Sequence, residues 1–171
     1  GIIQSFGETN SYRGRFLVFY GLNTDTEVNN GLKATGDDKA RLSNYDANVN
    51  NGQMNTDNNV WAKLYEGIER ANLAIKGIKT YGKIESSPQM AQLLGEILTL
   101  RAVLYNDLLK GWGDVPARFE PITTESTYLA RDDRDIIYKQ LLKDLEEAAG
   151  YLPWPNENAT TSRVERVNKA F

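Results

Sequence analysis

A long amphipathic helix, predicted over 88–110, constrains the fold of this chain more than any other feature. Apolar residues recur along it, and on into the turn that follows, with the helical period of about 3.6 residues and not the strand period of two. They are Met90, Leu94, Ile97, Leu98, Leu104, Tyr105, Leu108 and Trp112. Pro88 suits the first helical turn because its missing N–H has no partner there. The turn Asp114-Val115-Pro116 ends the helix, since the residue before a proline disfavours helical backbone.

Arg101 is the one charged residue in the apolar row of this helix, which also holds Ile97 and Leu104. Two interpretations are open. The stem of the side chain can pack while its guanidinium reaches water. Alternatively, the whole side chain is buried and fully hydrogen-bonded, and ties this helix to another. For the buried case we expect a contact with Asp144, or failing that with helix-end carbonyls and Asn72.

Two further helices are predicted beside the first, over 61–81 and 134–149. Asn72 and Asp144 fall on their inner faces and therefore need partners inside the protein. Gly82 is expected to end the earlier helix in a left-handed conformation, and a short turn then leads into Pro88. The sequence thus predicts an all-α fold of antiparallel helix pairs joined by long loops, with no sheet of more than two short strands.

The segment 42–59 is polar and irregular, with seven asparagines between Asn44 and Asn59. Asparagine favours turns, and long loops without regular structure are usually functional or disordered. A plain surface or disordered loop, a ligand-contacting loop and a metal loop are all open. Asp46, Asn48 and Asn50 alternate as in a calcium loop, but no glycine or glutamate stands where such a loop needs one. We therefore predict no metal site.

Composition excludes several classes of function. The chain has 171 residues, no cysteine and no histidine, so thiol chemistry and the commonest general base and metal ligand are missing. A net charge of −3 argues against nucleic-acid binding, which requires a clustered basic face. The paired carboxylates Glu146-Glu147 and Asp132-Asp133 are typical of solvated helix ends and not of a glycosidase site. No enzyme activity and no cofactor are predicted.

Four segments in order resemble the SusD/RagB family. Along the chain they are Trp61–Ile75, Leu100–Leu108 with Gly113–Pro116, Tyr138–Pro153 and Arg163–Ala170. The resemblance implies one SusD-like, tetratricopeptide-like helical region over 1–171, with a first helix at 1–22, a loop-rich segment at 23–59 and helix pairs at 60–171. It also implies an N-terminal piece of a longer protein whose lipid anchor lies outside this chain.

The resemblance further implies a surface-exposed lipoprotein of the outer membrane. Such a protein binds glycans or another nutrient, hands them to a SusC-like TonB-dependent transporter and performs no catalysis. The alternative is a generic helical-repeat scaffold for protein–protein interaction. The family assigns no individual glycan contact to this chain, so the candidate residues come from chemistry alone.

Sugars stack their apolar face on aromatic rings and bond their hydroxyls to amides and carboxylates. Among the loops, 42–59 combines one ring with a dense set of such groups. The predicted glycan-binding residues are Tyr45, Asp46, Asn48, Asn50 and Asn51. Trp154 is a rival platform, but its flanking prolines and Leu152 favour a packing role that seals the third helix.

Overall fold

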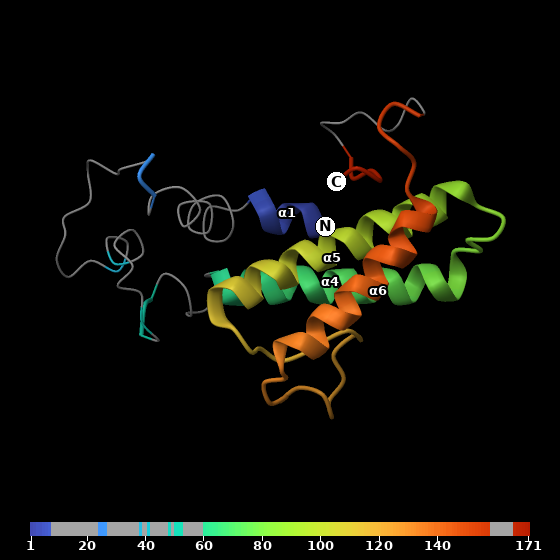
Figure 1. Ribbon diagram of the computed structural model, residues 1–171. Helices are drawn as coiled ribbons and strands as arrows, with labels where there is room; N and C mark the ends of the chain where they lie inside the picture. Colours follow the sequence, from blue (N-terminus) through green and yellow to red (C-terminus); the bar gives the residue numbers. More distant parts are fainter. Residues whose placement is uncertain are drawn as a thin grey trace. The chain divides into compact units, whose positions relative to one another are not determined.

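The computed structural model describes residues 1–7, 24–26, 38, 41, 48, 50–52, 60–157 and 166–171. Its helices in these ranges are α1 (Ile2–Gly7), α4 (Val60–Tyr81), α5 (Pro88–Trp112) and α6 (Arg134–Tyr151) (Figure 1). The described ranges hold no sheet, only an isolated antiparallel bridge between Val115 and Asp132. The all-α prediction is therefore confirmed.

The chain divides into two compact units, and the boundary falls inside α4. One unit consists of Gly1 and residues 3–66, and the other of Ile2 and residues 67–171. In the first unit, the rings of Trp61 and Tyr65 lie 5.0 Å apart on successive turns of α4. The helix predicted over 1–22 is described over Ile2–Gly7, and its remainder lies outside the described residues.

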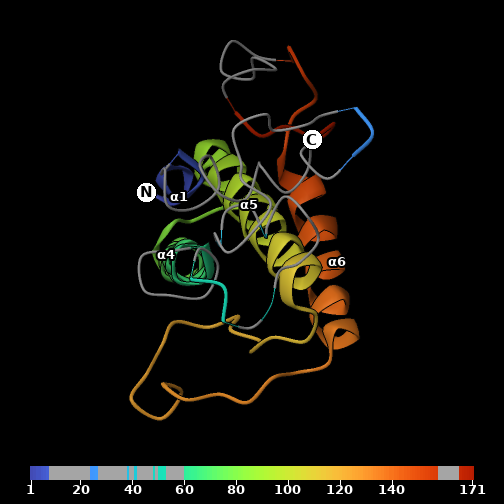
Figure 2. The ribbon, with the colours of Figure 1, turned by 90° about the vertical axis from the view of Figure 1, so that its left-hand side faces the viewer.

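The second unit is built around α5. Figure 1 shows α5 running antiparallel to both α4 and α6, and Figure 2 shows it between them. All three helices contribute to one apolar cluster, which buries part of the apolar row predicted along α5. Its buried members are Ala71, Ile75, Leu94, Ile97, Leu98, Ala148 and Leu152.

Local sequence signals set the ends of these helices. Ser87 caps α5 by accepting a hydrogen bond from the Met90 N–H, and Pro88 takes the first helical position. At the other end Gly113 has φ 74° and donates its N–H to the Leu109 carbonyl, a conformation that favours glycine. Asp133 caps α6 through the N–H of Asp135, 2.7 Å away. These caps fix where the connecting segments leave the helices.

The left-handed residue after α4 is Lys83, with φ 47°, and not Gly82 as the sequence suggested. Gly82 continues the helical hydrogen bonding, and its N–H donates to the Ile78 carbonyl at 2.7 Å. A Cβ at Gly82 would lie 2.6 Å from that carbonyl oxygen. The glycine is thus needed for close approach, while the reversal of the chain falls one residue later.

Candidate functional site

Arg101 is buried at the centre of the second unit, with 4% of its surface exposed. Its Nε and Nη2 donate to one carboxylate oxygen of Asp144 at 3.0 and 2.6 Å. Its Nη1 donates to the Asn72 side chain at 2.8 Å and to the Phe119 carbonyl at 3.1 Å. The structure therefore brings together all three predicted buried polar residues and excludes a guanidinium that reaches water.

The partners of Arg101 are themselves held by further hydrogen bonds. The Asn72 amide donates to the carbonyls of Arg118 and Glu120 at 3.0 and 3.1 Å. The second Asp144 oxygen accepts from Gln140 at 3.0 Å. The network joins α4, α5 and α6 to the segment that connects α5 with α6. Its role is to position this segment, because a bonded buried ion pair offers little surface to a ligand.

Tyr105 fastens the same segment from α5. Its hydroxyl accepts from the Arg118 N–H at 2.6 Å and donates to the Arg118 carbonyl at 2.7 Å. Its ring stacks on Phe119 with centroids 4.9 Å apart. Burial raises the pKa of Tyr105 well above its usual value, and the backbone hydrogen bond with Arg118 opposes that rise. The hydroxyl is therefore neutral at physiological pH and serves as a clamp.

The outer part of the connecting segment is a braced loop. The Arg118 guanidinium donates to the carbonyls of Ser126 and Thr127, and the Ile122 N–H donates to the Glu69 carboxylate. The Tyr128 side chain next to this brace is 93% exposed. Sequence reasoning gave no role to this loop.

The described part of the asparagine-rich segment separates its amides into two kinds. Asn48 and Asn50 are exposed, while Asn51 is 1% exposed. The Asn51 amide donates to the Asp38 carbonyl at 3.0 Å, and the Gly52 N–H donates to the Asp38 carboxylate at 2.8 Å. Asn51 thus holds the loop, and Asn48 and Asn50 face solvent. Tyr45 and Asp46 lie outside the described residues, so their convergence with these amides stays a prediction.

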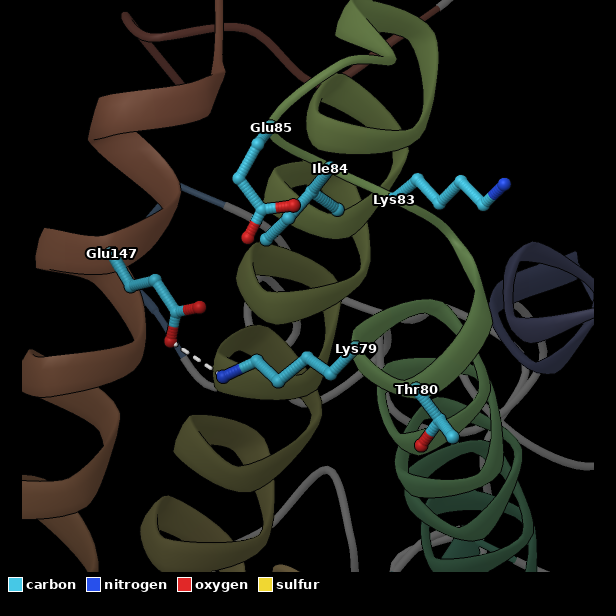
Figure 3. A pocket seen from close by; sticks show the side chains of 6 residues that line it. All are labelled: Lys79, Thr80, Lys83, Ile84, Glu85 and Glu147. Carbon is cyan, nitrogen blue, oxygen red and sulfur yellow. Dashed lines mark hydrogen bonds and ion pairs between the residues drawn. The ribbon is translucent and has the colours of Figure 1, made fainter.

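A polar pocket of about 420 Å³ lies where the end of α4 and the turn after it face α6. Figure 3 shows Lys79 reaching across to Glu147, with Nζ and Oε2 2.9 Å apart, and Lys83 pointing away. Glu85, Thr80 and Ile84 complete the lining. The pocket can bond hydroxyls but has no aromatic ring on which a sugar could stack. Its residues come from separate elements, and no motif in the sequence indicated them.

An apolar groove of about 320 Å³ runs along α5 and α6, lined by Val103, Leu142 and Phe171 among others. Leu142 is 60% exposed there. Trp154, just past α6, is 56% exposed. The expectation that Trp154 packs against the third helix was therefore wrong. Leu152 enters the core cluster, but the chain then makes a turn in which the Glu157 N–H donates to the Trp154 carbonyl.

Across the described ranges, no helix is long and apolar enough to cross a membrane. The same ranges contain no group of three or more acidic side chains that could hold a metal ion. Asp46 of the calcium-like spacing lies outside them.

Comparison with known proteins identifies the class. Residues 18–169 match a SusD-like family model described as "Starch-binding associating with outer membrane". The chain therefore belongs to the SusD-like family, whose description is that of a binding protein.

Two curated relatives come from Formosa agariphila. SusD-like protein P25 is 30% identical over 101 residues, and SusD-like protein P38 is 33% identical over 107 residues. These matches cover 57% and 61% of this chain but only 19% and 20% of the relatives. The chain thus spans about a fifth of the length of the curated relatives it matches.

Solved structures share the fold. A laminarin-binding SusD-like protein aligns with a TM-score of 0.76 at 21% identity, over 98% of this chain and 34% of its own. Surface glycan-binding protein A from Bacteroides uniformis aligns with a TM-score of 0.62 at 25% identity, over 81% of this chain and 30% of its own. A SusD superfamily protein from Bacteroides vulgatus aligns with a TM-score of 0.65 at 18% identity, over 98% and 36%.

Proposed function

We propose that this chain is part of a cell-surface protein that captures oligosaccharides at the outer membrane and delivers them to a SusC-like TonB-dependent transporter. The observation that carries the proposal is the family match over residues 18–169. It is supported by the names of two structural relatives, one laminarin-binding and one surface glycan-binding. The protein itself performs no chemistry on the glycan.

Retention in native gels tests the binding half of this proposal. Gels that contain laminarin, soluble starch or other polysaccharides should slow the protein relative to a gel without glycan. Unchanged mobility in every gel would contradict it. For delivery, we expect the tagged protein to co-purify from its host membrane with a TonB-dependent transporter, and recovery without any such transporter would contradict that half.

We further propose that glycan contacts lie in the asparagine-rich segment, with Tyr45 as the stacking ring, Asp46, Asn48 and Asn50 as the polar groups around it, and Asn51 as part of the frame that holds them. The exposure of Asn48 and Asn50 supports this placement. The bond from the Asn51 amide to the Asp38 carbonyl supports a framework role for that residue.

Tyr45→Ala should weaken retention roughly tenfold, because it removes the ring and leaves the amides in place. Tyr81→Ala, a change at a ring that is 82% exposed at the end of α4, is the matched control and should leave retention unchanged. Equal retention of the wild type and a folded Tyr45→Ala variant would remove this segment from the site.

A further inference from the structure

The loop after α6 holds an exposed indole in a fixed frame. Trp154 stands between Pro153 and Pro155, whose rings restrict the backbone. The Trp154 backbone N–H donates to the Glu157 carboxylate at 2.7 Å, and the Trp154 backbone carbonyl accepts from the Glu157 N–H at 3.1 Å. The loop therefore fixes the position of the Trp154 backbone although the ring itself is not buried.

The C-terminal residues brace the same loop from outside. The Lys169 N–H donates to the Pro153 carbonyl at 2.9 Å. The neighbouring Asn168 is buried and accepts from the Ala170 N–H at 3.1 Å. These contacts place the Lys169 ammonium 5.6 Å from the centre of the Trp154 ring. One ring, one ammonium and one carboxylate are thus held together by residues distant in sequence.

This arrangement differs from an ordinary surface residue. Tryptophan offers more apolar area than any other side chain, and its polar N–H suits a surface with one dry and one wet side. A cation over an exposed ring is only a weak contact, so Lys169 can move aside for a ligand. A single ring is too small for a protein interface, which buries about 800 Å² on each partner. The area of the Trp154 ring instead matches that of a ligand with a single small ring.

We propose that Trp154, Lys169 and Glu157 form a second carbohydrate site, which takes one pyranose unit of an oligosaccharide. The apolar face of the sugar stacks on the indole, while its hydroxyls accept from the Lys169 ammonium and donate to the Glu157 carboxylate. One positive and one negative side chain suit a sugar without net charge. This inference rests on the proposed function and adds a site to it outside the asparagine-rich segment.

Native gels with laminarin and with soluble starch test the second site. Trp154→Ala should weaken retention roughly tenfold in a gel that slows the wild type, and Trp154→Phe should weaken it less because a ring remains. Tyr128→Ala removes a ring that is 93% exposed on the loop between α5 and α6, and should change nothing. Circular dichroism of each variant checks that it is folded.

An NMR titration gives a readout that a purely structural role would not change. The sequence contains three tryptophans, and the indole N–H signal missing from Trp154→Phe assigns that residue. Adding laminarin or starch oligosaccharides should shift this signal in the wild type.

The outcomes separate this inference from the proposed function. Retention of the wild type and of Trp154→Ala to the same degree, or an indole signal unmoved by a glycan that binds, would overturn the second site alone. A wild type that no polysaccharide slows would contradict the proposed function, and the second site with it.

Discussion

Among single residues, Arg101 is one that links three helices and the segment connecting α5 with α6. A buried guanidinium is stable only when its donors are bonded, and Asp144, Asn72 and the Phe119 carbonyl all accept from it. The Phe119 ring also lies 5.1 Å from the guanidinium carbon. Arg101 therefore holds the structure together. Its removal should reduce the stability of the protein and should have less effect on glycan binding.

Arg101→Ala should lower the free energy of unfolding by about 3–5 kcal/mol, because it leaves the buried Asp144 carboxylate without its partner. Arg101→Met combined with Asp144→Leu should be much less destabilising, since neither charge then remains buried. Urea unfolding followed by circular dichroism measures both.

Arg134→Ala is the matched control for that experiment. Arg134 and Asp114 are 3.8 Å apart with side chains 61% and 50% exposed, so this pair should contribute less than about 1 kcal/mol. An Arg101→Ala variant no less stable than Arg134→Ala would show that Arg101 does not hold the helices.

Between helices, the close packing of α5 against the end of α6 depends on one glycine, Gly95. A Cβ at Gly95 would lie 2.9 Å from the Leu152 side chain and 3.1 Å from the Ala148 carbonyl oxygen. By contrast, nothing lies within 4 Å of the same position at Gly77 in α4. The two glycines separate helix propensity from packing.

Gly77→Ala should stabilise the protein by about 0.5–1 kcal/mol, because alanine restricts the unfolded chain and favours helix. Gly95→Ala gains the same helix propensity, but its new methyl group must displace the Ala148 backbone and the Leu152 side chain. The resulting overpacking costs about 1–3 kcal/mol, so this variant should be less stable than the wild type. Thermal unfolding of both variants gives the signs. Stabilisation by both would mean that α5 and α6 pack less closely than the structure shows.

The helices were predictable from sequence because their signals are local. Apolar spacing, together with Pro88 and the turn at Asp114-Val115-Pro116, placed α4, α5 and α6 with ends within about two residues, as is usual for helix boundaries. The Arg101 partners followed from the inner rows of those helices. The exposure of Trp154 did not follow, because burial of a loop ring depends on where the chain goes next. The pocket at Lys79 and Glu147 was also missed, because its residues come from separate elements that only the tertiary fold brings together.

The connecting segment makes the second unit more than a set of stacked helices, at the scale of the whole molecule. Residues 114–133 leave α5, return to α6 through the Val115–Asp132 bridge, and are held on the inside by Tyr105 and Asn72. Backbone groups of the segment are hydrogen-bonded to the buried side chains of Asn72 and Tyr105 on the helices, so the segment and the helices should unfold together. A titratable group within this contact therefore reports on the stability of the unit.

Tyr105 provides such a group, and the sign of its effect follows from linkage. Burial raises its pKa in the folded state above the unfolded value of about 10. Below that pH both states keep the proton, and the contribution to stability is fully present. As pH rises above about 10, the unfolded chain loses its proton first, so the free energy of unfolding falls.

Tyr105→Phe tests this assignment. At pH 8 the variant should be less stable by about 1–3 kcal/mol, because the Arg118 N–H and carbonyl lose their shared buried partner. From pH 8 to pH 11 the gap between wild type and variant should narrow, since only the wild type loses stability through Tyr105. Tyr81→Phe, at a ring 82% exposed, should match the wild type at both pH values. Urea unfolding at each pH measures the gap, and a gap that stays constant or widens would show that the Tyr105 hydroxyl is not protected in the folded protein.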